Sequence, residues 1–294
     1  MIGAAASTRH ERVGEALRAA GAALAAAGDG AWRLAPGADA DLQIVVREDG
    51  DWLCLAADVA AKRTDLFSCL QWNAGLAGLA KFVLAPGRSA VRLQAEIPLD
   101  RTVDLAAHIR LASAGICGGA AHIRGGRIRK TAEAAEDEAK PLDLRALCDA
   151  AGWACTPRSE TRLAAALDVP GGFHQAIVEE AAGLGIRAGA DLAEAQGPGG
   201  PSREAIARLL LRAGSAVRMV RPAAEAAGDR TLLRWEAVLG ARPGPQELRH
   251  ALAALSMACR LTAREVEMLQ DPAAARAYLS VLRLPKESGD AITT

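Results

Sequence analysis

The chain has 294 residues, about twice the usual length of a domain, so length alone predicts two domains. Its 35 basic and 35 acidic residues cancel, which argues against a general binder of nucleic acid, because such proteins carry a basic surplus. Charges interrupt the apolar pattern of residues 1–27, and no stretch approaches the roughly 20 apolar residues of a membrane span. We therefore expect no export signal and no membrane partner.

The first half of the chain predicts alternating helices and strands. Val13, Leu17 and Leu24 follow helical spacing, and the last of the strands alternates apolar and polar residues, as expected of an antiparallel sheet with one covered face. The predicted elements are a helix over residues 7–27, strands over 42–48 and 52–57, a helix over 65–79, strands over 81–84 and 91–97, and a helix from 102.

A change of composition separates this half from the second. Two glycines are followed by a basic run, Arg124, Arg127, Arg129 and Lys130, and then by acidic residues. Such a shift is typical of a linker. The sequence thus predicts a first domain over residues 1–118, a linker over 119–141 and a second domain over 142–294.

The second half predicts elements in a similar order. Ser202 is a good N-cap, and a long amphipathic pattern ends the half. The predicted elements are a helix from 142, strands over 162–169, 173–180 and 184–192, a helix over 203–212, strands over 217–221 and 231–238, and a helix over 245–269. The predicted fold class is α+β: two tandem α-β-β-β-α-β-β-α domains, each an antiparallel sheet packed against helices.

Residues that could perform chemistry do not form a known motif. The five histidines lie far apart, so we predict no metal and no cofactor. Cys148 and Cys155 fit neither a zinc knuckle nor a redox pair in their spacing, and we expect all six cysteines to be reduced core residues of a cytoplasmic protein. Glu179 and Glu180 are neighbours in a strand, point to opposite faces and are expected to be solvated.

Glycine-rich residues 197–202 precede a helix but lack the Gly-Lys-Ser/Thr ending of a phosphate loop, so a flexible loop is favoured over an anion site. The basic run has no interleaved aromatic residue and is followed by acidic residues, which favours solvation or internal pairing over contact with nucleic acid.

Tryptophans are the candidates for partner binding, because they stand out in a chain with only 3% aromatic residues. Core packing is the first interpretation, and exposure as interface anchors is the alternative. Trp235 is the preferred anchor, since it alternates with Leu233 on one face of a predicted strand, and Trp72 and Trp52 begin other elements. Whether Trp235 is exposed depends on which face the helices cover.

The element order resembles the fold of class I type III secretion chaperones and of the related YbjN-like domains. The passage over residues 72–84, followed by residues 91–99, resembles their central helix-to-hairpin segment, and the second copy follows mainly in element order. The resemblance implies a non-enzymatic protein that binds a partner polypeptide. This chain departs from the family in being duplicated and neutral, and the fused copies could serve as a monomeric pseudo-dimer in place of a homodimer.

The sequence thus predicts a protein- or peptide-binding module of the chaperone or adaptor kind, which uses a sheet edge, a sheet face or a helical groove. The alternative is a YbjN-like regulatory or stress-associated scaffold. An enzyme with a site at the domain interface is the third interpretation, and convergence of His174 and His250 in a deep cleft would favour it.

Overall fold

The structure is a computed structural model. It describes residues 2–21, 23–26, 31–35, 42–59, 65–76, 78–85, 90–100, 103–125, 142–169, 174–181, 185–195, 199–228, 230–240 and 242–283.

The first copy contains α1 (Ile2–Ala19), β1 (Ala23–Ala26), β2 (Ala31–Ala35), β3 (Ile44–Asp49), β4 (Trp52–Asp58), α2 (Leu66–Gly75), β5 (Lys81–Leu84), β6 (Val91–Pro98) and α3 (Leu105–Ile123). The second contains α4 (Leu144–Ala150), β7 (Cys155–Ser159), β8 (Arg162–Leu167), β9 (His174–Ala181), β10 (Gly185–Glu194), α5 (Pro201–Ala216), β11 (Arg221–Ala227), β12 (Arg230–Val238), α6 (Pro245–Leu269) and α7 (Pro272–Arg283).

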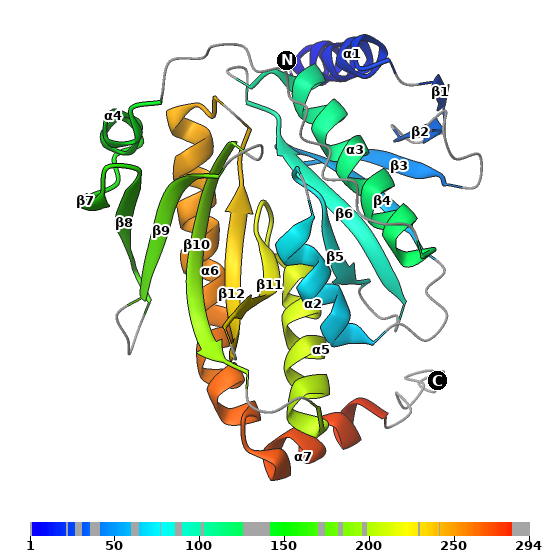
Figure 1. The fold of residues 1–294 in the computed structure, drawn as a ribbon. Helices are drawn as coiled ribbons and strands as arrows, with labels where there is room; N and C mark the ends of the chain where they lie inside the picture. The colour runs from blue at the N-terminus through cyan, green and yellow to red at the C-terminus, as the bar shows by residue number, and fades with distance from the viewer. Residues whose placement is uncertain are drawn as a thin grey trace, which may run out of the picture.

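Both copies form a six-stranded antiparallel sheet with the same strand order. From the outer edge inward, the first sheet is β1-β2-β3-β4-β6-β5 and the second is β7-β8-β9-β10-β12-β11 (Figure 1). The structure therefore confirms the α+β class with antiparallel sheets packed against helices. It also shows that the two halves share one topology, which the sequence indicated through element order.

Each copy has four strands before its middle helix, where the predicted fold has three. Residues 23–26 were expected to continue the first helix, because Leu24 follows Val13 and Leu17 at helical spacing, but they form β1. The outer strand β7 was missed because it is mostly exposed and polar and contains Pro157, so it shows no apolar alternation. An outer strand such as β7, which buries little apolar surface, carries a weak pattern.

Other boundaries also differ from expectation. Helix α3 continues to Ile123, so residues 119–123, assigned to the linker, are helical, and residues 126–141 lie outside the described part of the chain. Strand β11 occupies 221–227 rather than 217–221, since Met219 adopts a left-handed backbone with φ +63° that an extended strand cannot contain. Helix α7 was not predicted.

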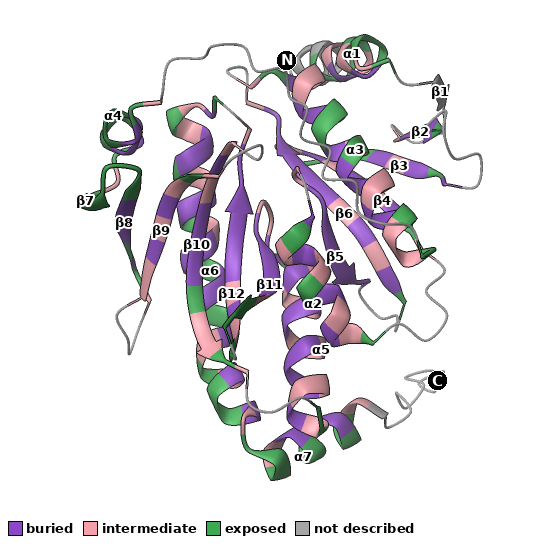
Figure 2. Ribbon diagram, in the orientation of Figure 1, coloured by how far each residue is buried: buried purple, intermediate pink, exposed green. Residues whose placement is uncertain are grey.

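Each sheet has one face covered by the long helix that follows its last strand. Helix α3 packs on β6 and β4, and helix α6 packs on β10, β12 and β8, while α2 and α5 lie side by side between the sheets (Figure 1). The buried residues concentrate on the sheet faces under α3 and α6 and around α2 and α5 (Figure 2). No helix in the described residues is long and apolar enough to span a membrane.

Local sequence explains where several helices begin. Asp65, Asp104 and Asp143 are the N-caps of α2, α3 and α4, and each side chain accepts a hydrogen bond from a main-chain N–H of the first turn. Such caps stabilise a helix by about 1 kcal/mol. Helices α5 and α6 instead start with a glycine N-cap followed by proline, which suits the first helical position.

Candidate functional site

The inner edges of the two sheets meet, and each is covered by the other copy. Helix α2 of the first copy packs on β11 of the second, helix α5 of the second packs on β5 of the first, and the two helices contact each other. Equivalent elements thus exchange places, as at an isologous dimer interface. The free backbone groups of β5 and β11 are therefore not available for addition of a partner strand.

The first residue of β5 bridges the two copies. Lys81 is almost fully buried and forms a salt bridge with Glu96 of β6, with 3.0 Å between Nζ and Oε2. Its Nζ also donates to the main-chain oxygens of Val217 (2.7 Å) and Val220 (3.1 Å) in the second copy. Met219 of the same loop donates its N–H to Glu96 at 3.3 Å. The first copy's buried ion pair therefore holds the loop between α5 and β11.

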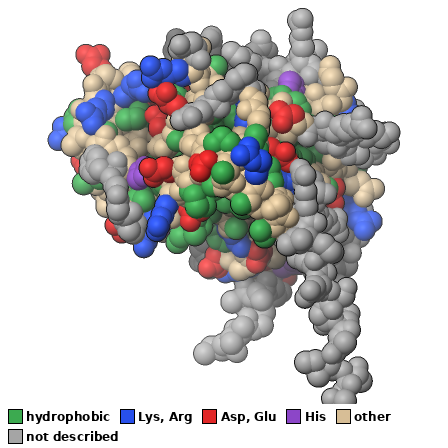
Figure 3. Space-filling model, turned by 90° about the horizontal axis from the view of Figure 1, so that it is seen from below, with side chains coloured by type: hydrophobic (Ala, Val, Ile, Leu, Met, Phe, Trp, Pro, Cys, Tyr) green, Lys and Arg blue, Asp and Glu red, His purple; other side chains and the backbone are tan. Residues whose placement is uncertain are grey.

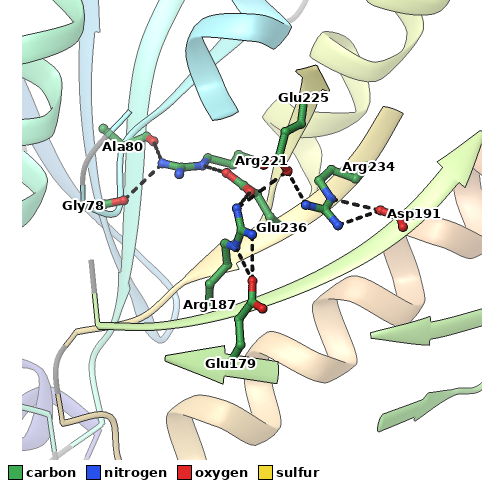
Figure 4. Close-up of polar contacts among 9 residues, drawn as sticks. All are labelled: Gly78, Ala80, Glu179, Arg187, Asp191, Arg221, Glu225, Arg234 and Glu236. Atoms are coloured by element: carbon green, nitrogen blue, oxygen red, sulfur yellow. Dashed lines mark hydrogen bonds and ion pairs between the residues drawn. The ribbon is translucent and has the colours of Figure 1, made fainter. Parts of the chain in front are cut away.

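The first residue of β11 makes the reciprocal contacts. Arg221 is buried and pairs with Glu236 of β12, with 2.6 Å between Nε and Oε1. Its Nη1 donates to the main-chain oxygens of Gly78 and Ala80 in the first copy, both at 3.2 Å (Figure 4). Glu96 follows Lys81 at the spacing at which Glu236 follows Arg221, 15 residues. This repeated basic–acidic spacing is visible in the sequence and could have indicated the two equivalent pairs.

Burial lowers the pKa of Lys81, and the charge and hydrogen bond of Glu96 oppose this effect. A buried ion pair of this kind contributes little net stability, since desolvation of both charges offsets their attraction. Removing one partner is costly, however, because the other charge is left buried and unpaired. The two pairs thus fix how the copies fit together.

Asn73 adds a third polar connection between the copies. It is fully buried in α2, accepts a hydrogen bond from the Phe82 N–H (2.7 Å) and donates to the oxygens of Phe82 (3.1 Å) and Pro222 (2.8 Å). Gly214 is the corresponding residue of α5, three residues before the helix C-cap. A Cβ there would lie 3.0 Å from Pro222 and 3.4 Å from Val83. Asn73 and Gly214 therefore both lie where the two inner edge strands meet.

The helices α3 and α6 meet near their N-termini through a buried histidine. His108 Nε2 lies 3.0 Å from Glu247 Oε1, and His108 Nδ1 lies 2.8 Å from the main-chain oxygen of Asp104. Both neighbours are acceptors, so only the doubly protonated ring satisfies both contacts. Burial lowers the pKa of His108, but the hydrogen bonds and charges of Glu247 and Asp104 outweigh it and leave the pKa raised.

The face of the second sheet opposite α6 carries a network of charges (Figure 4). Its members pair across five strands, β8 to β12, and they are Arg162, Glu179, Arg187, Asp191, Arg221, Glu225, Arg234 and Glu236. Glu179, expected to be solvated, pairs with Arg187 at 2.7 Å and with Arg162 at 2.8 Å. Four arginines face four carboxylates, so this network is neutral and presents no excess charge to a charged partner.

The outer edge of the second sheet is poorly suited to strand addition. Strand β7 is largely exposed, but it contains Pro157 and an irregular register between Pro157 and Ser159. Arg158 lies between them. Proline, bulges and charges on an edge strand all disfavour pairing with a further strand. The outer strand of the first sheet, β1, has only four residues.

The preferred anchor Trp235 is a core residue, so the first interpretation, core packing, is correct for it, and the alternative of an exposed anchor is wrong. Trp235 and Leu233 are fully buried, because α6 covers the face of β12 on which they lie. The Trp235 Nε1–H donates to Thr262 Oγ1 of α6 at 2.9 Å. The alternation in the strand was predicted correctly, but it does not indicate which face a helix covers.

Trp52 and Trp72 are partly buried within the fold. The Trp52 ring lies 6.0 Å from the His250 ring and 5.3 Å from the Arg218 guanidinium, so it contacts the second copy. Trp72 packs against Phe82 at 5.5 Å and His122 at 4.8 Å. Whether either tryptophan also contacts a partner stays a prediction.

The histidines considered for an interface site lie in different places. His174 begins β9 and pairs with Leu167 of its own sheet, whereas His250 of α6 packs on Trp52 of the first copy. Among the described residues there is no group of three or more potential metal ligands.

An exposed apolar stripe on α6 was missed in the sequence. Met257, Leu261 and Met268 lie on its outer side and are 50%, 50% and 55% exposed. They are three of the five large hydrophobic residues exposed in the described part of the chain, with Leu111 and Val281. Counted from each helix start, the residues of α3 that correspond to Met257 and Leu261 are the smaller Cys117 and Ala121. The apolar bulk is thus particular to the second copy.

Comparisons with known proteins give no further guide. No family model, curated protein or solved structure matches the chain.

Proposed function

We propose that this protein is a non-enzymatic polypeptide-binding protein of the chaperone or adaptor kind, which works as a monomeric pseudo-dimer in a cytoplasmic compartment. The resemblance of residues 72–84 and 91–99 to secretion chaperones and YbjN-like domains supports this proposal. The reciprocal packing of the copies also supports it, because the second copy occupies the surface that a second subunit would otherwise cover.

The observation that carries the proposal is the apolar stripe Met257, Leu261 and Met268 on α6. Soluble proteins seldom leave several large apolar side chains in a row on one helix unless that helix binds something. Methionine is adaptable in shape, which suits a surface that accepts varied apolar partners. Figure 3, which views the end of the molecule at which α7 lies, shows hydrophobic side chains among acidic and basic ones. Such a mixed surface suits a polypeptide partner.

The other surfaces are less suitable. The inner sheet edges are covered, β7 contains proline and a bulge, and the charged face of the second sheet is neutral by internal pairing. We therefore propose that the partner is an amphipathic helix that packs its apolar side on α6. Arg260 and Arg264 are exposed next to the stripe, so acidic residues flanking the apolar side of the partner would strengthen binding.

A selection with displayed peptides tests the proposal. A library of amphipathic 20-residue peptides would be selected on the full chain, and selected peptides would be titrated by calorimetry against wild type and the triple variant M257Q/L261Q/M268Q. We expect at least a tenfold weaker Kd for the variant, with Leu111→Gln on α3 as a control that binds like wild type. Selected peptides that bind the triple variant equally well would disprove the α6 surface. Failure to select any peptide would count against polypeptide binding itself.

A further inference from the structure

Two cysteines at the end of α4 are brought together by a tight turn. The Gly152 N–H donates to the Asp149 oxygen at 3.0 Å and the Trp153 N–H donates to the Cys148 oxygen at 3.1 Å. Gly152 has φ +69°. These two bonds and the left-handed glycine define a Schellman motif, which reverses the chain at the end of a helix. Cys155, the first residue of β7, therefore returns beside Cys148 in the last turn of α4.

Helix α4 and strand β7 are in contact, and the two thiols lie close enough to shift each other's pKa: Cys155 raises that of Cys148, and Cys148 lowers that of Cys155. They differ in access, because Cys148 is fully buried and Cys155 is partly exposed. The turn itself is held from the other side, since Arg249 of α6 donates to the Ala151 oxygen at 2.7 Å. The pair thus sits in a fixed position rather than on a free loop.

We propose that Cys148 and Cys155 form a thiol modification site, which small disulfides oxidise reversibly to an intramolecular disulfide. Cys155 is the residue that such a reagent reaches first, and Cys148 is the resolving thiol. The bond would join the last turn of α4 covalently to the edge strand β7. The site does not depend on the proposed polypeptide binding.

The reaction balances in two exchange steps. The Cys155 thiolate attacks one sulfur of a small disulfide, forms a mixed disulfide and releases one equivalent of small thiol. The Cys148 thiolate then attacks the Cys155 sulfur, forms the intramolecular bond and releases the second equivalent. The protein loses two electrons and two protons, and the small disulfide is reduced to two thiols.

The surroundings set how fast these steps are. Burial raises the pKa of Cys148 to about 12, and the hydrogen bond to Cys155 raises it as well. Burial also raises the pKa of Cys155, while the hydrogen bond from Cys148 lowers it. Because the thiolate is the attacking species, oxidation should accelerate as pH rises. The experiment is therefore run at mildly alkaline pH.

The sequence offers a direct readout, because trypsin cleavage after Arg145 and Arg158 releases one peptide, 146–158, with both cysteines and no others. The folded full-length protein would be incubated with oxidised glutathione, denatured, alkylated and digested for mass spectrometry. Cys54 is the internal control, since it is partly exposed and surrounded by Glu96, Arg218, Asp49 and Lys81 rather than by a thiol.

We expect peptide 146–158 to lose two hydrogens and both alkylation sites, so that alkylatable cysteines fall from six to four when no other cysteine reacts. A reductant should restore them. In Cys148→Ala, Cys155 should accumulate one glutathione, and in Cys155→Ala, Cys148 should stay reduced. A wild-type protein that keeps glutathione on Cys155, or that is modified at Cys54 while peptide 146–158 stays reduced, would overturn the proposal. The wild-type result decides the matter even if a variant fails to fold.

Discussion

Lys81 and Arg221 occupy equivalent positions in the two copies, and each donates hydrogen bonds to the main chain of the other copy. Each also pairs with a buried glutamate of its own copy. Each side chain therefore contacts its own copy through the glutamate and the other copy through main-chain oxygens. The same two residues thus connect the inner edge strand of each sheet to the other copy.

Replacing Lys81 with methionine should destabilise the protein by about 3–5 kcal/mol, because Glu96 is then left buried without its cation. The double variant K81M/E96L should recover part of the loss, since it removes both buried charges. Equilibrium unfolding in urea measures both free energies. Arg221→Met is the matched variant of the other copy and should behave similarly. A single variant as stable as wild type would contradict the assigned pair.

Replacing Asn73 with alanine should cost about 2–6 kcal/mol, because it leaves the Phe82 N–H and the Pro222 main-chain oxygen without their partner at about 1–3 kcal/mol each. Gln71→Ala, an exposed residue of the same helix, is the control and should change the free energy of unfolding by less than about 0.5 kcal/mol. Equal effects of the two variants in urea would rule out the bridging role of Asn73.

Much of the fold could be predicted because long periodic elements carry their own pattern. The bounds predicted for α6 and β5 are those of the structure, and β3, β4, β6 and β12 differ by a few residues. Strands β1, β2 and β7 were missed, since strands of four or five residues are too short to show a clear alternation, and β7 is also mostly exposed. Periodicity therefore predicted the centre of each sheet better than its outer edge.

The interface between the two copies could not be predicted from the sequence, for a different reason. Nothing local in the sequence indicates that Lys81 contacts Val217 and Val220, because that contact exists only after the two copies pack. The sequence could not decide between a core position and an exposed position for Trp235, because strand alternation gives two faces but does not say which one a helix covers. Tertiary packing determines both the contacts of Lys81 and the burial of Trp235.

Trp235 should behave as a core residue in mutagenesis. Trp235→Ala is expected to lower the free energy of unfolding by about 3–5 kcal/mol, because it removes a fully buried indole. Trp235→Phe keeps a six-membered aromatic ring but loses the rest of the indole and the hydrogen bond to Thr262, so the loss should be smaller than that of the alanine variant but still measurable. An alanine variant of wild-type stability would mean that the side chain is exposed after all.

His108 should make stability depend on pH. Its folded pKa is raised, so its contribution is fully present below the unfolded value of about 6.5 and is lost as pH rises through the folded value. His108→Gln should therefore cost more stability at pH 5.5 than at pH 9. The charged groups facing it are Glu247 of α6 and Asp104 of its own helix, and Glu96 lines the same small cavity.

Urea unfolding at both pH values measures this difference. His174→Gln, in the second sheet, is the control for the general effect of losing a histidine. A cost for His108→Gln that is equal at the two pH values, or larger at the higher one, would contradict the ionised pair with Glu247.

The triple variant M257Q/L261Q/M268Q should leave stability almost unchanged, by less than about 0.5 kcal/mol per site, because the side chains are half exposed and glutamine matches methionine and leucine in helix propensity. Urea unfolding measures this directly, with Leu255→Gln as the contrasting variant, since Leu255 is fully buried on the inner side of the same helix. That variant should cost at least about 3 kcal/mol, because it buries an amide without a partner. If the triple variant is as destabilised as Leu255→Gln, the stripe belongs to the core of the protein. If it is stable and no longer binds selected peptides, the loss must arise from the outer surface of α6 itself.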